Sequence, residues 1–184
     1  MTLLLILLGV VVVVVLAVVA IYNNLVGLRQ SVQSAWSQID VQLKRRHDLI
    51  PNLVESVKGY MAHEKQTLES VTQARSLAAQ AGSITAKAQA ETALTQALRG
   101  FFAVAERYPD LKASTNMATL QEELGTTENR IAMARQVYNE NVMRYNTAVS
   151  TIPSNFVASL GGFKPSEFFS IEDPSHRQAP AVKF

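Results

Sequence analysis

The histidines and carboxylates are the side chains with which this chain could do chemistry. His63-Glu64 begins like the His-Glu-x-x-His motif of zinc proteases, but position 67 is Thr, so the second histidine is missing. No histidine lies between His63 and His176, which excludes the Glu-x-x-His sets of di-iron helical bundles. The absence of cysteine excludes a thiol nucleophile. We therefore expect no enzyme activity, no catalytic residue, no metal site and no cofactor.

A group of polar side chains recurs at spacings of three and four residues, which places them near one another on a helix. The group consists of Asp40, Lys44, Arg45, Asp48 and Asn52. One interpretation is a set of surface ion pairs, each worth a few tenths of a kcal/mol. The other is a polar surface kept for a partner helix. The sequence leaves both open, and this group is the candidate partner surface.

The basic run Lys44-Arg45-Arg46 has the composition of a patch for anionic lipid. On a straight helix, however, it would stand roughly 35 Å beyond Ile21, where the apolar N-terminal run ends. That distance is several Debye lengths, so the surface potential of a membrane is screened there. We therefore expect a solvated helix face at this run.

Two asparagines, Asn139 and Asn146, lie seven residues apart, and each follows a tyrosine of an apolar stripe. Asparagine at heptad spacing can fix the register of packed helices at some cost in stability. The pair is interpreted as a register or tyrosine hydrogen-bonding device, with a binding site as the alternative.

An apolar run without a charged side chain extends from Leu3 to Ile21. As a helix it is about 28 Å long, close to the thickness of the hydrocarbon core of a bilayer. A cleavable signal peptide is the alternative, since Val18-Val19-Ala20 would be tolerated as a cleavage sequence. No basic residue precedes the run, however, and the run is longer than a typical signal core. We expect a single-pass anchor that contacts membrane lipid through residues 3–21.

The charges beyond this run constrain the class of partner and the orientation of the chain. The chain has seventeen basic and fifteen acidic residues, and its net charge is +2. The two signs are mixed along the chain, so there is no basic stripe for nucleic acid. Arg29 just after the anchor slightly favours a soluble domain on the cytoplasmic side of the membrane.

Beyond the anchor, apolar residues recur every three to four positions, the spacing that keeps one face of a helix apolar. The pattern predicts three long helices, separated near Gly82 and Pro109 and ended by Pro153. Pro51 should kink the first of them, or break it with Asp48 as a new cap, and so divide it into two segments. The stripe of the first helix comprises Leu28, Val32, Trp36, Ile39, Leu43, Ile50, Val54, Val57, Met61, Leu68 and Val71.

The predicted fold class is therefore all-α, an N-terminal transmembrane helix followed by an antiparallel helical bundle of three to four segments. Its expected parts are an anchor over residues 1–22, a bundle over 23–152 and an irregular tail over 153–184. The tail carries two glycines and several of the six prolines, and we expect it to be loose after Glu172. Its aromatic residues are expected to dock on the bundle, and they are Phe156, Phe163, Phe168 and Phe169.

Several blocks follow one another in a recognisable order. They are Tyr22-Asn23, Leu25-Val26 and Leu28-Arg29, then WSQIDVQLKRRHDLIPNLVESVKGYMAHE (Trp36 to Glu64), Ala74-Arg75, YPDLKA (Tyr108 to Ala113), LQEELGTTENRIAMAR (Leu120 to Arg135), YNENVMRYN (Tyr138 to Asn146) and the final Phe184. In these blocks the chain resembles the LemA family of small bacterial membrane proteins. It departs from the family pattern at residues 114–117, where the family usually has an Asn and an aromatic residue.

The resemblance implies an anchored antiparallel helical bundle at the bacterial cytoplasmic membrane, and it brings no catalytic residues. It also implies an association with envelope-stress or membrane-protease components. We expect a scaffold, adaptor or oligomeric organiser that acts by protein–protein contact, with an unidentified protein partner or a second copy of the chain. The alternative is a membrane-remodelling or lipid-handling module.

Overall fold

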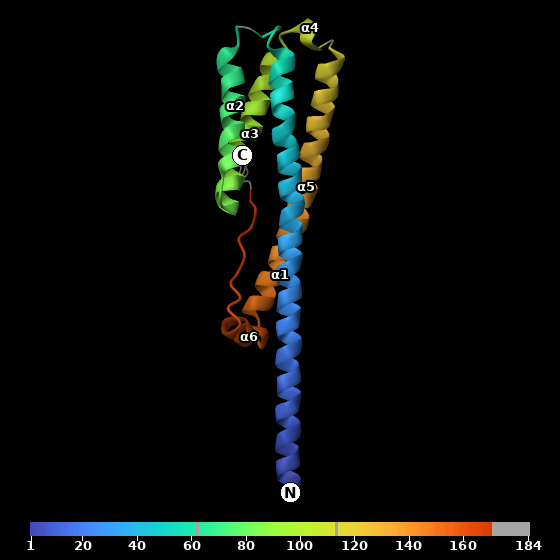
Figure 1. The fold of residues 1–184 in the computed structure, drawn as a ribbon, viewed down its shortest axis with the longest axis vertical. Helices are drawn as coiled ribbons and strands as arrows, with labels where there is room; N and C mark the ends of the chain where they lie inside the picture. Colours follow the sequence, from blue (N-terminus) through green and yellow to red (C-terminus); the bar gives the residue numbers. More distant parts are fainter. Residues whose placement is uncertain (62, 113, 171–184) are drawn as a thin grey trace, which may run out of the picture. The chain divides into compact units, whose positions relative to one another are not determined.

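Helix α1 runs from Thr2 to Val57 in the computed structural model, which describes residues 1–61, 63–112 and 114–170 (Figure 1). Its N-terminal apolar part makes it the one helix, among the described residues, that is long and apolar enough to cross a membrane. None of the most apolar stretch is buried within the protein. A helix that is apolar on every side and not covered by protein is stable in an apolar solvent such as a bilayer. This part of α1 therefore agrees with the expected membrane anchor.

The first predicted helix is divided into two segments, but the division does not fall at Pro51. Helix α1 includes Pro51 and continues to Val57, and the next helix, α2, begins at Lys65. A proline inside a helix leaves the carbonyl four residues earlier without a donor. Here that carbonyl belongs to His47, and Arg75 on α2 donates to it from Nε at 2.6 Å. The lost helical hydrogen bond is thus replaced from a neighbouring helix, and Asp48 is not the cap of a new helix.

The chain divides into two compact units. Among the described residues, unit 1 comprises residues 1–40 and 133–168, and unit 2 comprises residues 41–132 together with Phe169 and Ser170. Helices α1 and α5 each contribute to both units, and the units are described separately below. The expected boundaries at residues 22 and 152 remain predictions.

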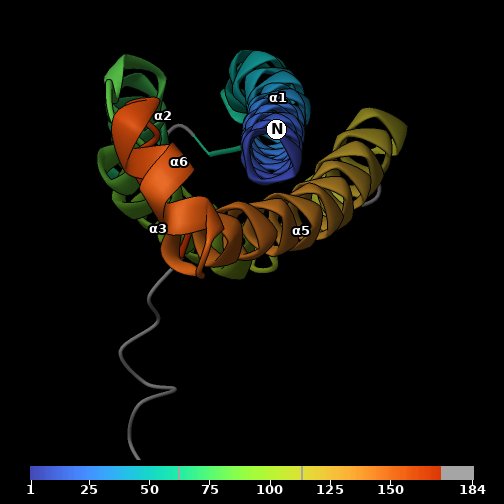
Figure 2. The ribbon, with the colours of Figure 1, turned by 90° about the horizontal axis from the view of Figure 1, so that it is seen from below.

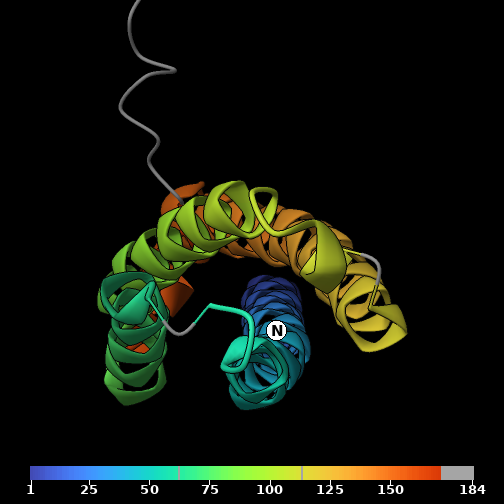
Figure 3. The same cartoon turned by 90° about the horizontal axis from the view of Figure 1, so that it is seen from above.

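Unit 2 contains four long helical segments, as the bundle prediction requires. They are residues 41–57 of α1, α2 (Lys65–Gln80), α3 (Ile84–Ala105) and residues 115–132 of α5, with the short α4 (Pro109–Lys112) between α3 and α5. Helices α2 and α3 pack side by side, and α2, α3 and the first half of α5 curve around this part of α1 (Figure 3). Ser83 caps α3 by accepting a hydrogen bond from the amide of Ala86 at 3.1 Å. The start of α3 thus lies at the helix break predicted near Gly82.

Part of the predicted apolar stripe lies in the core of unit 2, where Val54 and Leu68 are only partly buried and Leu53, which the stripe did not include, is fully buried. Removing these side chains from water is the main source of its stability, at roughly 25 cal/mol per Å² of apolar surface. The buried members include Ile50, Leu53, Val57, Met61, Val71, Leu94, Leu98, Phe101, Leu111, Met117 and Leu124.

Unit 1 joins the N-terminal part of α1 to the second half of α5 (Thr115–Ser150), to α6 (Ser154–Leu160) and to the extended residues 163–168. Seen from below, α6 lies next to the end of α5 (Figure 2). Part of the tail that we expected to be irregular is thus helical, because residues 154–160 contain neither glycine nor proline. Phe163 and Phe169 are buried, whereas Phe156 and Phe168 are exposed; the residues after Glu172 lie outside the described residues.

Candidate functional site

A cluster of charged side chains lies within unit 2, buried at Arg46, His47 and Glu91 and half-exposed at Glu128. Arg46 on α1 pairs through Nη2 with the carboxylate of Glu91 on α3, and through Nη1 with Glu128 on α5 at 2.5 Å. Nη1 also donates to the hydroxyl of Thr95 at 3.2 Å. The second carboxylate oxygen of Glu91 lies 2.8 Å from Nε2 of His47. Arg46 and Glu91 are only 2% and 1% exposed.

Within this cluster the Arg46 guanidinium lies between two carboxylates, those of Glu91 and Glu128. Burial raises the pKa of the Glu91 carboxyl, but the hydrogen bond from His47 and the charge of Arg46 outweigh burial and hold that pKa below its ordinary value. Glu91 is therefore an anion that carries no exposed lone pair for a substrate. Because a sliding movement of α1 against α3 would leave buried charges unpaired, the cluster fixes the register of these helices.

The basic run Lys44-Arg45-Arg46 is not a uniformly solvated face, and that expectation is wrong for Arg46. Lys44 and Arg45 are exposed, but Arg46 and His47 are buried. A signal for this was present in the sequence. The apolar stripe passes from Leu43 to Ile50 without an apolar residue at the turn between them, and Arg46 and His47 occupy that turn. Glu91 likewise stands three residues before Leu94 at the start of the α3 stripe.

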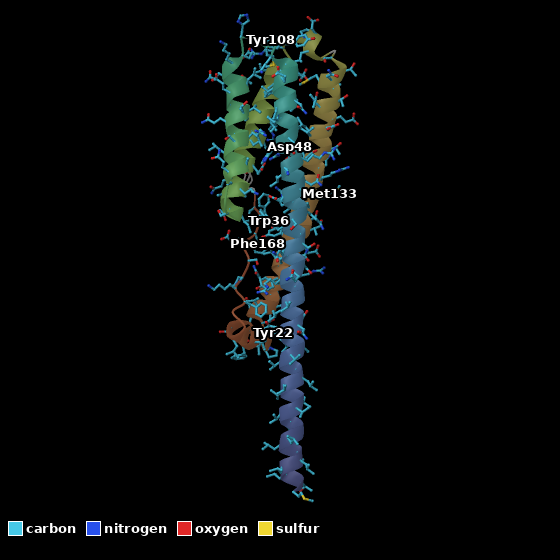
Figure 4. The ribbon with its side chains drawn as sticks, viewed as in Figure 1. Tyr22, Trp36, Asp48, Tyr108, Met133 and Phe168 are labelled. Carbon is cyan, nitrogen blue, oxygen red and sulfur yellow. The ribbon has the colours of Figure 1, made fainter. Side chains whose placement is uncertain are left out.

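The predicted partner surface is exposed at all five positions. Asp40 is the last residue of the N-terminal segment of unit 1, whereas Lys44, Arg45, Asp48 and Asn52 lie in unit 2. Figure 4 labels Asp48 on α1. In unit 2 these four residues alternate along α1 with the buried residues Leu43, Arg46, His47, Ile50 and Leu53. One side of this helix is therefore held by the ion cluster and the core, and the other side presents polar groups to solvent.

A groove of about 740 Å³ runs between α2 and α3. Small side chains line much of it, among them Ser70, Ala74, Ala93, Ala97 and Gly100. Small residues let another chain approach the helix backbones closely. The groove is a second surface of unit 2 that could receive a partner segment.

The His63-Glu64 pair lies at the turn before α2, and Glu64 is engaged in a structural contact. Its carboxylate accepts a hydrogen bond from the hydroxyl of Tyr108 at 3.2 Å and lies 3.5 Å from Nη2 of Arg107. Among the described residues, no three His, Cys, Asp or Glu side chains lie close enough together to hold a metal ion. The contacts of Glu64 join the α1–α2 turn to the end of α3.

In unit 1, three side chains of α5 hold the backbone of the extended residues 163–168. Tyr145 donates to the carbonyl of Lys164 at 3.0 Å, and Tyr138 donates to that of Glu167 at 2.8 Å. The amide of Asn146 donates to the carbonyl of Ser166 at 2.9 Å and accepts from its N–H at 2.8 Å. Burial raises the pKa of both phenols, so each keeps the proton that it donates.

This contact assigns a role to Asn146 that spacing alone did not reveal. Asn146 binds neither a register partner nor its neighbouring tyrosine but the backbone of a segment twenty residues further along the chain. Extended backbone has free N–H and C=O groups, and side-chain amides are suited to pair with them. Three side chains of α5 thus bind the backbone of residues 163–168, whatever the side chains of Lys164, Ser166 and Glu167.

Comparison with known proteins gives a consistent family relationship. The sequence profile of the LemA family matches residues 35–184. Magnetosome protein MamQ 2 of Paramagnetospirillum magneticum is 25% identical over 174 residues, which is 80% of this chain and 64% of that protein. Protein LemA of Metamycoplasma hominis is 28% identical over 137 residues, or 74% of this chain and 63% of that protein. The chain thus spans less than two thirds of the length of these curated relatives.

Proposed function

This chain belongs to the LemA family, and from that premise we propose that it is a scaffold or adaptor that works by protein–protein contact. Its family and the exposed apolar part of α1 make it a membrane-associated protein. The finer assignment, to the bacterial cytoplasmic membrane with the helical units in the cytoplasm, is part of the proposal and rests on Arg29 beside the apolar run.

One observation carries the proposal: the exposed polar residues of α1 in unit 2 are placed directly over a buried ion cluster. The cluster holds α1 through Arg46 and His47, and Arg75 of α2 holds it again at the carbonyl of His47. A surface on a helix that is fixed in this way loses little conformational freedom when a partner binds. Lys44, Arg45 and Asp48 would supply a mixed-charge rim that selects the partner and its orientation.

The proposed partner is a protein at the same membrane, either an envelope-stress or membrane-protease component or a second copy of this chain. A noncatalytic role is likewise proposed. It is consistent with the use of Arg46, His47, Glu91 and Glu64 in contacts within unit 2.

The test uses the full chain in native membranes with a photoreactive amino acid at position 44, 45 or 48. The matched control carries the same group at position 130, an exposed arginine of α5 in unit 2. We expect one protein adduct of constant mass at the α1 positions and none at position 130. With the photoreactive amino acid at position 48, the double change K44E/R45E should reduce the amount of adduct at least about tenfold. A loss of 1.4 kcal/mol in binding free energy would have this effect.

The possible results discriminate between the functions considered. An adduct with twice the mass of the chain would identify an oligomeric organiser. Adducts with lipid alone would overturn the proposal in favour of a lipid-handling module. Equal labelling at the α1 positions and at position 130 would show that the polar residues of α1 do not form an interface.

A further inference from the structure

A patch of large apolar side chains is exposed at the end of unit 1. Ile152, just before α6, is 78% exposed, and Phe156 and Leu160 on α6 are 64% and 90% exposed. Phe156 and Leu160 are four residues apart on α6, the spacing that brings side chains to one side of a helix, and Ile152 lies in the turn that leads into α6. No charged residue occurs from Thr151 to Phe163. Clustered apolar residues without charges among them are unusual on a surface that faces only water.

The rest of α6 is packed, so this exposure is not that of a loose helix. Val157 and Ala158 are buried, and the hydroxyl of Ser154 donates to the carbonyl of Ala148 at 2.5 Å. The helix therefore presents two different sides, one to the protein and one outward.

The position of α6 along α1 is fixed by Phe163. The ring of Phe163 is buried and meets the ring of Tyr22 edge to face, with centroids 5.4 Å apart. The guanidinium carbon of Arg29 lies 5.1 Å from the centre of the same ring. Tyr22 directly follows Ile21, the last residue of the apolar run, and Figure 4 shows it level with the part of unit 1 that Figure 1 labels α6.

Two glycines place the Phe163 ring in this position. Gly162 has a φ of +70°, a backbone conformation that other residues adopt only with strain. A Cβ on Gly161 would lie 2.6 Å from Cε2 of Phe163, so the ring occupies the space that a side chain would need. The sharp turn lets the chain leave α6 and return at once to α1.

We propose that α6 is a second membrane contact, with Ile152, Phe156 and Leu160 inserted at the boundary between the headgroups and acyl chains of the bilayer that α1 spans. Continuity with the apolar run of α1 commits the patch to lipid, because Tyr22 marks the level at which a spanning helix leaves the hydrocarbon. Two cationic side chains lie near the end of α6, Arg29 against the Phe163 ring and the exposed Lys164 next to Phe163 in sequence, and lipid phosphates would accept their charges. Two contacts with one bilayer would fix the rotation of α1 about its axis, which a single helix cannot do.

The absence of native cysteine allows a direct test in the full-length chain. Single variants L160C and M133C are labelled with an environment-sensitive fluorophore and reconstituted into vesicles of phosphatidylcholine and phosphatidylglycerol. Met133 is the matched control, since it is 69% exposed and lies on α5 in the same unit, roughly 26 Å along the helix from Ser150. Lipids with a nitroxide near the headgroup report contact with the bilayer, and iodide reports contact with water.

We expect lipid nitroxide to quench the label at position 160 and not the label at position 133. Iodide should quench the label at position 160 at least about tenfold less than the label at position 133. This is the ratio that 1.4 kcal/mol of insertion free energy produces. Adding F156D to L160C should abolish the lipid quenching while circular dichroism shows unchanged helix. Because the vesicles contain no other protein, this result is independent of the proposed adaptor role.

Either of two results would overturn the proposal. Equal iodide access at positions 160 and 133 would place the patch in water. Protection from iodide without quenching by lipid would mean that protein covers the patch, and dilution of the chain in the vesicles would then identify a second copy as the cover.

Discussion

Arg75 on α2 donates from Nε to the carbonyl oxygen of His47 on α1 at 2.6 Å, the carbonyl that Pro51 leaves without its helical donor. Proline costs a helix interior about 3 kcal/mol or more, partly through that unpaired carbonyl. In this protein the defect is used as an acceptor for a neighbouring helix. The side chain of the same residue, His47, contacts Glu91. His47 therefore links the hydrogen bond that compensates for Pro51 to the ion cluster.

Replacing Arg75 by Ala should lower the free energy of unfolding by about 1.5–3 kcal/mol, because it removes a hydrogen bond from a charged donor to a buried carbonyl. In a P51A background the loss should be smaller by about 1 kcal/mol, since an alanine in place of Pro51 restores the helical donor. Urea unfolding followed by circular dichroism measures both. R99A, at an exposed arginine of α3, serves as the control. Equal losses in the two backgrounds would show that Arg75 and Pro51 are independent.

The E91Q variant should lose about 3 kcal/mol of stability near neutral pH, because Arg46 and His47 lose their shared anion. The folded-state pKa of Glu91 is lowered, so its contribution is fully present above about 4.3, the pKa of an unfolded glutamate. That contribution is lost as the pH falls through the lowered folded-state pKa. The stability difference between the two proteins should therefore shrink in acid.

Unfolding in urea at about pH 7 and about pH 3.5 measures this difference. E122Q, at an exposed glutamate of α5, should change stability little at either pH. A constant difference between wild type and E91Q at both pH values would contradict the ionised, paired state of Glu91.

The N146A variant should free the extended residues 163–168 from α5. Two hydrogen bonds to the backbone of Ser166 are lost, at about 1 kcal/mol each. Hydrogen exchange should accelerate at the Ser166 amide, whose acceptor is Oδ1 of Asn146. The control is N141A, because Asn141 donates to Val137 within α5 at 3.1 Å. Unchanged exchange at Ser166 would mean that Tyr138 and Tyr145 suffice to hold the segment.

Deletion of residues 2–21 should yield a soluble protein that keeps its remaining helices. The most apolar stretch of α1 buries nothing within the protein, so its removal costs no packing. Circular dichroism in detergent-free buffer and sedimentation measure the result. A marked loss of helix would show that the bilayer stabilises the rest of the fold.

The helices could be predicted from the sequence because they depend on local order. Each signal that predicts a helix or its end involves residues close together in sequence. These signals are the apolar run from Leu3 to Ile21, the three-to-four spacing elsewhere, and the breaks at Gly82 and Pro109. The family could be read in the same way, from contiguous blocks such as Trp36 to Glu64. The exposure of Lys44, Arg45 and Asp48 also followed from this spacing.

Only the tertiary structure decided which charged residues are interior. Arg46 and Arg45 are neighbours of the same type, yet one is buried because Glu91 and Glu128 reach it from helices forty-five and eighty-two residues away. Pro51 remains within α1 because Arg75 supplies a donor from α2. Asn146 binds Ser166 because the turn at Gly161 and Gly162, which follows α6, leads the chain back along α1 and α5. Each outcome depends on a partner distant in sequence; the gap in the apolar stripe between Leu43 and Ile50 marks the place of Arg46, but local spacing does not identify its partners.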